Sequence, residues 1–361
     1  MSDIKDMIAD GVNRLFAGIV NRDVLDAAES GAWQAGLWQA VTESGYADVL
    51  GGETEDELAG KWADAFPVFH AIGFHRLPLP LSETIIARAL LRRAGLAVPA
   101  GEAPLSVIQQ QAGDGLALEL GAGALSLNGT VQAVPWASAA AALVVAGRIG
   151  DRQVLAVVDT KAPGVTLRCG INVAREPRDE VIFQHARCDA FVFCDQLPTA
   201  PVTLYGGLAR AAMMAGAVES ILRESVQYAN DRVQFGRSIG KFQAIQQALA
   251  ALAGEVTSAQ TVALAACEAA ASSPRAFSVA VAKIRTGQAA GLAASIGHQV
   301  HGAIGYTYEH SLHYATRRLW SWRAEFGSEA EWAKQLGRDA IARGSANFWS
   351  DLTERGNAAN R

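Results

Sequence analysis

Cysteine is scarce in this sequence. The 361 residues include only four cysteines, Cys169, Cys188, Cys194 and Cys267. None belongs to a C-x-x-C pair, which argues against a zinc site or a dithiol redox motif, so we expect no metal centre. So few scattered thiols also argue against a disulfide framework, and we therefore expect a reducing, cytoplasmic environment.

The sequence also lacks an excess of positive charge and a long apolar run. It has 31 Lys and Arg against 36 Asp and Glu, a net charge of −5, which argues against a surface for nucleic acid. Its first residues, Met-Ser-Asp-Ile-Lys-Asp, lack the pattern of a signal peptide. No run approaches the roughly 18 apolar residues of a membrane helix, so we expect no membrane association.

What is present is a globular composition whose character changes twice along the chain. Half of the residues are hydrophobic and 19% are charged. Residues 1–100 favour helices, since Ile4, Ile8 and Val12 have helical spacing, and further helices are expected over residues 53–72 and 81–95. We predict a helical domain at 1–100, a β domain at 101–200 and a helical bundle at 201–361.

The middle part consists of short β-rich runs separated by turn residues, a spacing typical of an antiparallel barrel or sandwich. Asn128-Gly129 lies between two of these runs and predicts a hairpin turn. The expected strands are 105–109, 116–120, 124–127, 130–134, 142–146, 154–158, 165–167, 181–183 and 190–193.

The last part returns to long apolar-periodic segments that predict a bundle. Its expected helices are 204–231, 242–271, 276–304, 311–324 and 329 to about 346. Between the first two lies a turn with Arg232, Gln234 and Phe235 before Gly236, a mix that can hold a phosphate and a flat ring. The alternative is an arginine at a helix end that pairs with a carboxylate such as Glu224 or Asp231.

Two motifs carry a family resemblance. The first is Arg-Val-Gln-Phe-Gly at 232–236 followed by Phe242-Gln243, and the second is Gln-Val-His-Gly-Ala-Ile-Gly-Tyr at 299–306. Both resemble signatures of the acyl-CoA dehydrogenase family, most strongly over residues 200–325. The resemblance implies an α+β fold with an N-terminal helical domain, a middle antiparallel β domain and a C-terminal helical bundle, and it implies FAD as the cofactor.

The same resemblance implies which residues contact the cofactor. Arg232, Gln234, Phe235, Phe242 and Gln243 match positions that contact the FAD pyrophosphate and adenosine, typically those of the neighbouring subunit. The second motif adds residues around the adenosine half, with Ala303 in place of the family's second glycine; the alternative for this segment is an ordinary C-cap turn. Its residues are Gln299, His301, Gly302 and Ala303, of which His301 is expected to pack or to donate a hydrogen bond.

The chain departs from the family at the catalytic base. In relatives a carboxylate at one of two positions removes the α proton of the acyl thioester. Here Phe326 occupies the first position and Gly206 or Gly207 the second. Glu325, one residue before Phe326, is the candidate catalytic base, and the alternative for it is a surface or helix-capping carboxylate.

Retained cofactor motifs beside vacant base positions resemble one branch of the family. Its members are short subunits of heteromeric α2β2 enzymes in steroid side-chain degradation, in which a paralogous partner supplies the base. The resemblance implies α,β-dehydrogenation of a bulky, steroid-type acyl-CoA in lipid metabolism, with electron-transfer flavoprotein as the electron acceptor. Two alternatives stay open: a homomeric acyl-CoA dehydrogenase that uses Glu325, and a non-catalytic assembly subunit.

Overall fold

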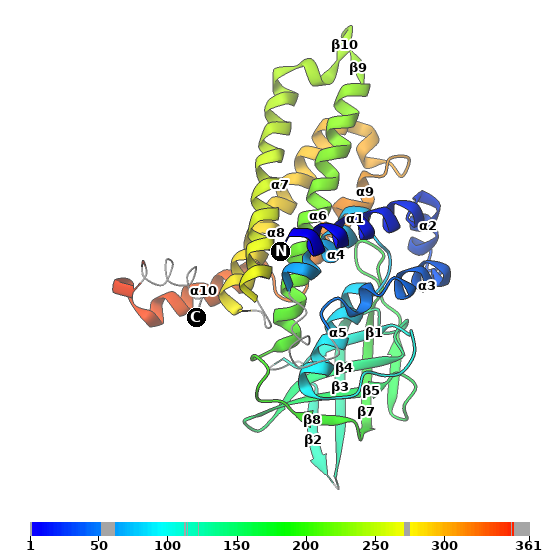
Figure 1. The fold of residues 1–361 in the computed structure, drawn as a ribbon, viewed down its shortest axis with the longest axis vertical. Helices are drawn as coiled ribbons and strands as arrows, with labels where there is room; N and C mark the ends of the chain where they lie inside the picture. Colours follow the sequence, from blue (N-terminus) through cyan, green and yellow to red (C-terminus); the bar gives the residue numbers. More distant parts are fainter. Residues whose placement is uncertain are drawn as a thin grey trace. The chain divides into compact units, whose positions relative to one another are not determined.

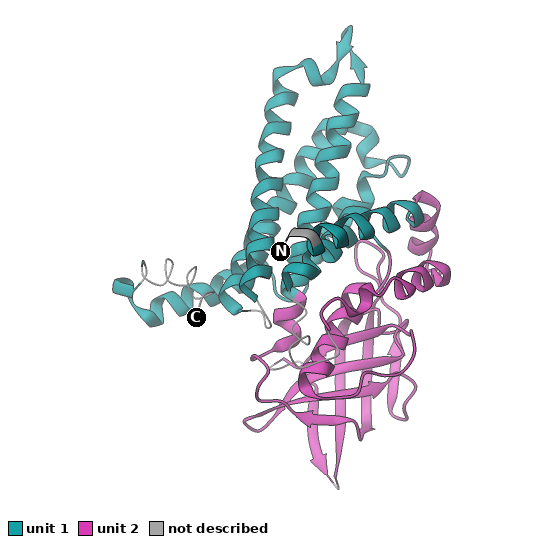
Figure 2. Ribbon diagram, viewed as in Figure 1, with its two compact units in different colours: residues 1–20, 61–77, 207–361 teal, residues 21–60, 78–206 magenta. Residues whose placement is uncertain are grey.

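The structure, a computed structural model, describes residues 2–51, 62–111, 113, 115–121, 123–270, 275–347 and 349. By its internal contacts the chain forms two compact units (Figure 2). We call residues 1–20, 61–77 and 207–361 the helical unit, and residues 21–60 and 78–206 the mixed unit. Both units are discontinuous in sequence, and the three consecutive domains inferred from composition stay a prediction.

The helical unit is built from long helices that run side by side (Figure 1). The expected α-helices of the C-terminal part are present within one to three residues, while residues 302–306 form a 3-10 turn. The bounds are α1 Ser2–Ile19, α4 Trp62–His75, α6 Pro201–Asp231, α7 Gln243–Ala270, α8 Ala276–His301, α9 Leu312–Ala324 and α10 Glu329–Arg343. Of the helix expected over 53–72, residues 53–61 lie outside the described residues.

Glycine allows α4 and α6 to cross closely. A Cβ atom on Gly73 of α4 would clash with the carbonyl of Met213, and one on Gly216 of α6 would clash with the carbonyl of His70. Each glycine thus faces the backbone of the other helix, so a larger residue at either position would push the helices apart. This crossing anchors the N-terminal helices of the unit to the start of the bundle.

The mixed unit contains two four-stranded sheets, with orders β1-β4-β5-β8 and β2-β3-β7-β6. Their inner faces meet in a core that includes Leu125, Leu143 and Phe183. The strands are β1 Leu105–Gln109, β2 Ala117–Gly121, β3 Ala124–Pro135, β4 Ala142–Ile149, β5 Arg152–Asp159, β6 Val165–Arg168, β7 Arg178–Cys188 and β8 Phe191–Phe193. The helices of this unit are α2 Arg22–Glu29, α3 Ala35–Glu43 and α5 Leu81–Ala94, with a 3-10 turn η1 at Tyr46–Asp48.

The strands are antiparallel with one exception. β1 and β4 pair in parallel, with Leu105 opposite Ala142 and Gln109 opposite Ala146. A parallel pair needs a long crossover connection, and here β2 and β3 of the other sheet lie within it. The expectation of β-sheets in the middle of the chain is therefore confirmed, while one sheet is mixed rather than purely antiparallel.

The hairpin predicted at Asn128-Gly129 was wrong. Both residues lie inside the continuous strand β3, at a shift in its register with β7. Gly129 has φ 131°, and a Cβ on it would clash with the carbonyl of Gly115. The glycine serves a bulge and a close backbone contact, which have the same local signature as a turn.

One described helix has the length and composition of a membrane span although it contains no run of about 18 apolar residues, and the expectation of no membrane association stays a prediction. α7 is long and apolar enough to cross a membrane, with a mean hydropathy of 1.3 over an 18-residue window. Alanine residues between scattered polar residues contribute much of this mean hydropathy, so the sequence contains no unbroken apolar run at α7. One such helix is weak evidence for a membrane. Only 22% of the window is buried inside the chain, and the exposed positions of α7 are alanine, glycine and polar residues.

Candidate cofactor-binding site and base positions

The first motif forms a tight hairpin between α6 and α7. β9, Val233–Gln234, pairs with β10, Arg237–Ser238, and the turn residues Phe235 and Gly236 have φ 53° and 77°. Positive φ at both turn positions is the geometry that matches the twist of two short strands. The Ile239 N–H donates to the Arg232 carbonyl at 2.8 Å and closes the hairpin.

The hairpin then turns back onto α6 and starts α7. A Cβ on Gly240 would lie 3.1 Å from the Ala229 carbonyl, so glycine permits this close return. The Phe242 carbonyl accepts from the N–H groups of Ile245 and Gln246, both at 3.1 Å, and the helix begins at Gln243. The positive end of the α7 dipole therefore lies beside the hairpin, where it favours an anion.

Three polar side chains of the motif, those of Arg232, Gln234 and Gln243, have no hydrogen-bond or ion-pair partner among the described residues. The carboxylate of Glu224 binds Arg76 and, at 3.2 Å, Ser311, while that of Asp231 accepts from Gln227. The pairing of Arg232 with either carboxylate, which was the alternative to a ligand role, is thus not formed. Among the described residues, the side chains exposed without an ion pair or hydrogen bond include Arg232, Gln234, Gln243 and Gln299.

Two phenyl rings lie beside these donors. Phe235 is 92% exposed, and its ring meets that of Phe242 edge-on at 6.2 Å between centroids. The Arg237 guanidinium lies 4.2 Å from the centre of the Phe242 ring. An exposed aromatic residue in a left-handed backbone is unfavourable on its own, so its presence here indicates a surface that serves contact with another molecule.

The second motif ends α8 at the same end of the bundle. His301 is 3% exposed, and its Nδ1–H donates to the Gly297 carbonyl at 2.7 Å. Its ring lies 4.5 Å from that of Tyr228, which is one helical turn before Arg232, so the structure brings the two motifs to one end of the unit. Gly302, with φ 64°, and Ala303 follow in the 3-10 turn η3, Gly302–Tyr306, and are exposed.

These residues fit the dinucleotide that the resemblance implies. A guanidinium and three amides without partners can donate to phosphate and ribose oxygens, and two rings offer a flat apolar wall. In the described part of the chain, the Nε2 atom of His301 is buried without a hydrogen-bond partner. Burial lowers the pKa of His301, so its imidazole is neutral at physiological pH and suits hydrogen bonding rather than ion pairing.

The positions that the resemblance predicts for the catalytic base, Phe326 and one of the alternatives Gly206 and Gly207, meet in space. A Cβ on Gly207 of α6 would lie 3.6 Å from the carbonyl of Phe326, which follows α9, and 3.0 Å from Val279 of α8. Neither Gly207 nor Phe326 has a group that accepts a proton. The sequence identified both positions, but their adjacency depends on how α6 and α9 pack.

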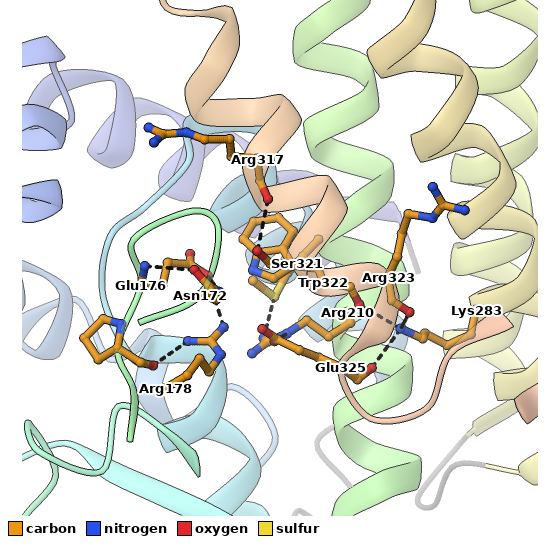
Figure 3. Close-up of polar contacts among 12 residues, drawn as sticks. Asn172, Glu176, Arg178, Arg210, Lys283, Arg317, Ser321, Trp322, Arg323 and Glu325 are labelled. Carbon is orange, nitrogen blue, oxygen red and sulfur yellow. Dashed lines mark hydrogen bonds and ion pairs between the residues drawn. The ribbon is translucent and has the colours of Figure 1, made fainter. Parts of the chain in front are cut away.

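Glu325, the candidate base, has a charged partner. The Arg210 Nε–H donates to its carboxylate at 2.7 Å, and the Arg210 side chain is 1% exposed (Figure 3). The guanidinium carbon of Arg210 also lies 5.2 Å from the centre of the Phe326 ring. This ion pair gives the carboxylate a structural role within the chain, while its use as a base stays a prediction.

Sequence reasoning missed Lys283, which is completely buried beside this turn. Its Nζ donates to the carbonyls of Trp322, Arg323 and Glu325 at 2.9, 3.2 and 2.9 Å (Figure 3). The one available signal was a lysine within the apolar run Val-Ala-Val-Ala-Lys-Ile, where a charge is expensive unless it has partners.

A second missed feature is an open cavity of about 710 Å³ between α1, α4, α6 and α7. The His70 Nε2 lies 3.1 Å from the Glu219 carboxylate, to which Gln260 also donates. The hydrogen bond from His70 lowers the pKa of Glu219. His70, Glu219 and Gln260 are therefore bonded to one another, and these side chains need no ligand in the cavity to complete their hydrogen bonds.

Comparison with known proteins agrees with the architecture. The profile of the acyl-CoA dehydrogenase C-terminal domain matches residues 204–340. The acyl-CoA dehydrogenase IpdE2 of Mycobacterium tuberculosis is 29% identical over 81% of this chain and 82% of its own length.

Solved structures match nearly the whole chain. The ChsE4-ChsE5 complex from Mycobacterium tuberculosis has a TM-score of 0.84 at 19% identity, over 95% of this chain and 98% of the matched chain. A glutaryl-CoA dehydrogenase from Mycobacterium smegmatis in complex with FADH2 has a TM-score of 0.79 at 17% identity, over 94% and 95% of the two chains. At such identities these likenesses establish the fold, which the helices, sheets and bundle described above already display. Together with the domain profile and the IpdE2 relative, they show that this chain has the acyl-CoA dehydrogenase fold and that its residues 204–340 match the C-terminal domain of that family.

Proposed function

We propose that this chain is the FAD-dinucleotide-binding subunit of a heteromeric acyl-CoA dehydrogenase that acts on a bulky, steroid-type acyl-CoA. A paralogous partner subunit supplies the catalytic base. The likeness to IpdE2 and to the ChsE4-ChsE5 complex supports the reaction class and the heteromer. The cytoplasm as its location and electron-transfer flavoprotein as its electron acceptor belong to the same proposal.

One contrast carries this proposal. The donors at the α6–α7 hairpin are exposed and without partners within the described residues, whereas the two base positions hold Phe326 and Gly207. The nearest carboxylate, that of Glu325, is bonded to a buried arginine. Such a chain is equipped to hold a cofactor and depends on another subunit for proton abstraction.

The residues of the two motifs would contact different parts of FAD, according to the chemistry of their side chains. FAD, when bound, supplies the hydride acceptor for the β carbon of the acyl group. In our proposal, Arg232 binds a phosphate oxygen, and the Gln234, Gln243 and Gln299 amides orient the pyrophosphate and ribose. Phe235 and Phe242 cover the adenine, and the N-terminal end of α7 adds positive potential beside the phosphates.

The uncovered face of α7 supports a protein partner. Only 22% of an 18-residue window of this helix is buried inside the chain, and its exposed positions include Ala244, Ala250 and Ala251, small residues against which another subunit can pack closely. The same helix begins at the hairpin, so a subunit that packs on α7 can reach the cofactor motif. We therefore propose that the partner contacts α7 and completes the FAD site.

Purification with and without the partner tests the proposal. The chain is expressed alone and together with a family member that carries a glutamate at one of the two base positions. We expect stoichiometric FAD and dehydrogenase activity only in the combined preparation, measured by flavin absorbance and by reduction of an artificial electron acceptor. Full activity with stoichiometric FAD in the lone chain would rule out the partner-supplied base.

A homomeric enzyme that uses Glu325 is the second candidate, because Glu325 lies in the same turn as the vacant position and its side chain is 16% exposed. The variant Glu325→Gln keeps the shape of the side chain and removes the carboxylate. Loss of turnover with FAD retained would favour the homomer, whereas unchanged turnover in the combined preparation supports a base from the partner. A complex that assembles but never holds flavin would indicate an assembly subunit instead.

A further inference from the structure

The end of α9 lacks an ordinary cap. Helices often end with a glycine whose left-handed backbone satisfies the last carbonyls, but the C-cap residue here is Glu325 with an extended backbone (φ −74°, ψ 141°). The last carbonyls of α9 face the interior of the helical unit, where an unsatisfied acceptor is costly. The partner they find is the ammonium group of Lys283, which comes from α8.

The turn that follows is strained. Phe326 has φ 53°, a left-handed conformation that a bulky residue seldom adopts, and Gly327 follows with φ 96°. Such a backbone persists only where the surroundings hold it on several sides. Here the Trp332 indole N–H donates to the Phe326 carbonyl at 3.1 Å, and Ser328 with Glu331 forms a capping box that starts α10.

We infer that Lys283 is the positioning residue of the turn at 325–328: its ammonium group joins the end of α9 to α8 and so fixes Glu325 and Phe326 opposite Gly207. This role goes beyond the proposed function and does not depend on which subunit supplies the base. The other contacts described above, the Trp332 hydrogen bond and the capping box, hold the turn at Phe326 and on its C-terminal side. Lys283 holds the turn on its α9 side, because its ammonium group donates hydrogen bonds both to that helix and to the Glu325 carbonyl.

The clamp depends on the charge of the lysine. An ammonium group has three N–H donors for the three carbonyls, whereas a neutral amine has two. The charged groups that face it are Glu325 of the turn, Glu329 of α10, Arg210 of α6 and Arg323 of α9. Burial, only partly opposed by the glutamates, lowers the pKa of Lys283 to about 7, so the clamp changes its donor number near neutral pH.

Hydrogen–deuterium exchange of the full chain, followed by mass spectrometry, tests this role. In the wild type we expect residues 322–328 to be protected at pH 6, and this protection to rise by about tenfold towards pH 9 after correction for intrinsic rates, because the buried neutral amine costs less than the buried ammonium group. In Lys283→Met the same segment should exchange faster at every pH, with no pH-dependent change of protection. Wild-type exchange at 322–328 as fast as that of exposed α10 would overturn the inference.

The matched control is Lys334→Met, which removes an exposed lysine of α10 and should leave exchange at 322–328 unchanged. If Lys283→Met does not fold, the wild-type pH series decides alone, since protection that stays constant from pH 6 to 9 contradicts the role of the ammonium. Lys283→Arg should restore part of the protection in a folded protein, because it keeps a cation with several N–H donors. No restoration would contradict the inference.

Discussion

The dipeptide Phe-Gly occurs twice in this chain with nearly the same backbone and opposite surroundings. Phe235-Gly236 has φ values of 53° and 77°, and Phe326-Gly327 has 53° and 96°. Phe235 is 92% exposed at the tip of a hairpin, whereas Phe326 is held between the Arg210 guanidinium and the Trp332 indole. The same positive φ is therefore presented to solvent in one place and occurs in a half-buried turn in the other.

The contrast between the two Phe-Gly turns distinguishes a segment suited to binding from a segment that supports the fold. At the hairpin, the Arg232 guanidinium and the Gln234 and Gln243 amides have no hydrogen-bond partner among the described residues, so they can bond to a ligand or to another subunit. At the 325–328 turn the chain uses its own Lys283, Arg210 and Trp332 to hold the backbone. The proposed function assigns the hairpin to contact with the cofactor and the partner, and assigns the turn, which has Phe326 and not a carboxylate at the predicted base position, to support.

The largest effect is expected at Gly327. In Gly327→Ala a Cβ would enter a backbone with φ 96° and lie 2.5 Å from the Trp332 indole nitrogen. Strain and overlap together should lower the free energy of unfolding by about 3 kcal/mol. Urea denaturation checks this against Gly337→Ala in α10, where a Cβ meets nothing within 4 Å and a gain of up to about 1 kcal/mol is expected. Equal effects of the two variants would mean that the turn is not enclosed.

The next effect concerns cofactor retention at the hairpin. Arg232→Ala removes a guanidinium that has no partner in the described residues, so the fold should keep its stability. The affinity of the assembled protein for FAD should fall roughly thirtyfold, which corresponds to about 2 kcal/mol for a charge-assisted hydrogen bond. Flavin fluorescence titration measures it, with Arg338→Ala on exposed α10 as the control. Identical affinities in both variants would remove Arg232 from the site.

A smaller effect is expected from the pH dependence of stability. The pKa of Lys283 is lowered from 10.5 to about 7, so between these values the unfolded chain binds a proton that the folded chain does not. Folding stability therefore rises with pH through this window, by about 1.4 kcal/mol per pH unit at most, and this gain is absent below pH 7. The difference in unfolding free energy between wild type and Lys283→Met isolates it. A difference that does not change from pH 7 to 9 contradicts the assignment.

The smallest effect is expected when each of the two phenylalanines is replaced by asparagine. Asparagine tolerates the left-handed backbone, so Phe235→Asn should raise the unfolding free energy by about 0.5 kcal/mol while it weakens FAD binding. Phe326→Asn relieves the same strain but loses the ring over Arg210, so its net stability should not increase. Thermal unfolding of the pair sharpens the comparison, and a gain in both variants would mean that the Phe326 ring contributes nothing.

The sequence was most informative where a signal is local. Helix bounds followed from apolar periodicity, so that α8 and α9 begin within one residue of their expected starts. Strand β1 coincides with the expected segment at 105–109. The Asn128-Gly129 pair misled because a glycine with positive φ serves a turn and a bulge equally well, and only the approach of Gly115 distinguishes them.

The amino-acid sequence by itself determined the order of helices and strands, the family motifs at 232–243 and 299–306, and the absence of a carboxylate at Phe326 and Gly207. These properties depend on residue type and short-range spacing, which the chain carries in any conformation. Only the tertiary structure decided that the vacant positions face each other, that Arg210 binds Glu325, and that Lys283 closes α9. Each of these contacts joins segments far apart in the chain, and it exists because the packing of α6, α8 and α9 excludes water and leaves buried charges and carbonyls no other partners.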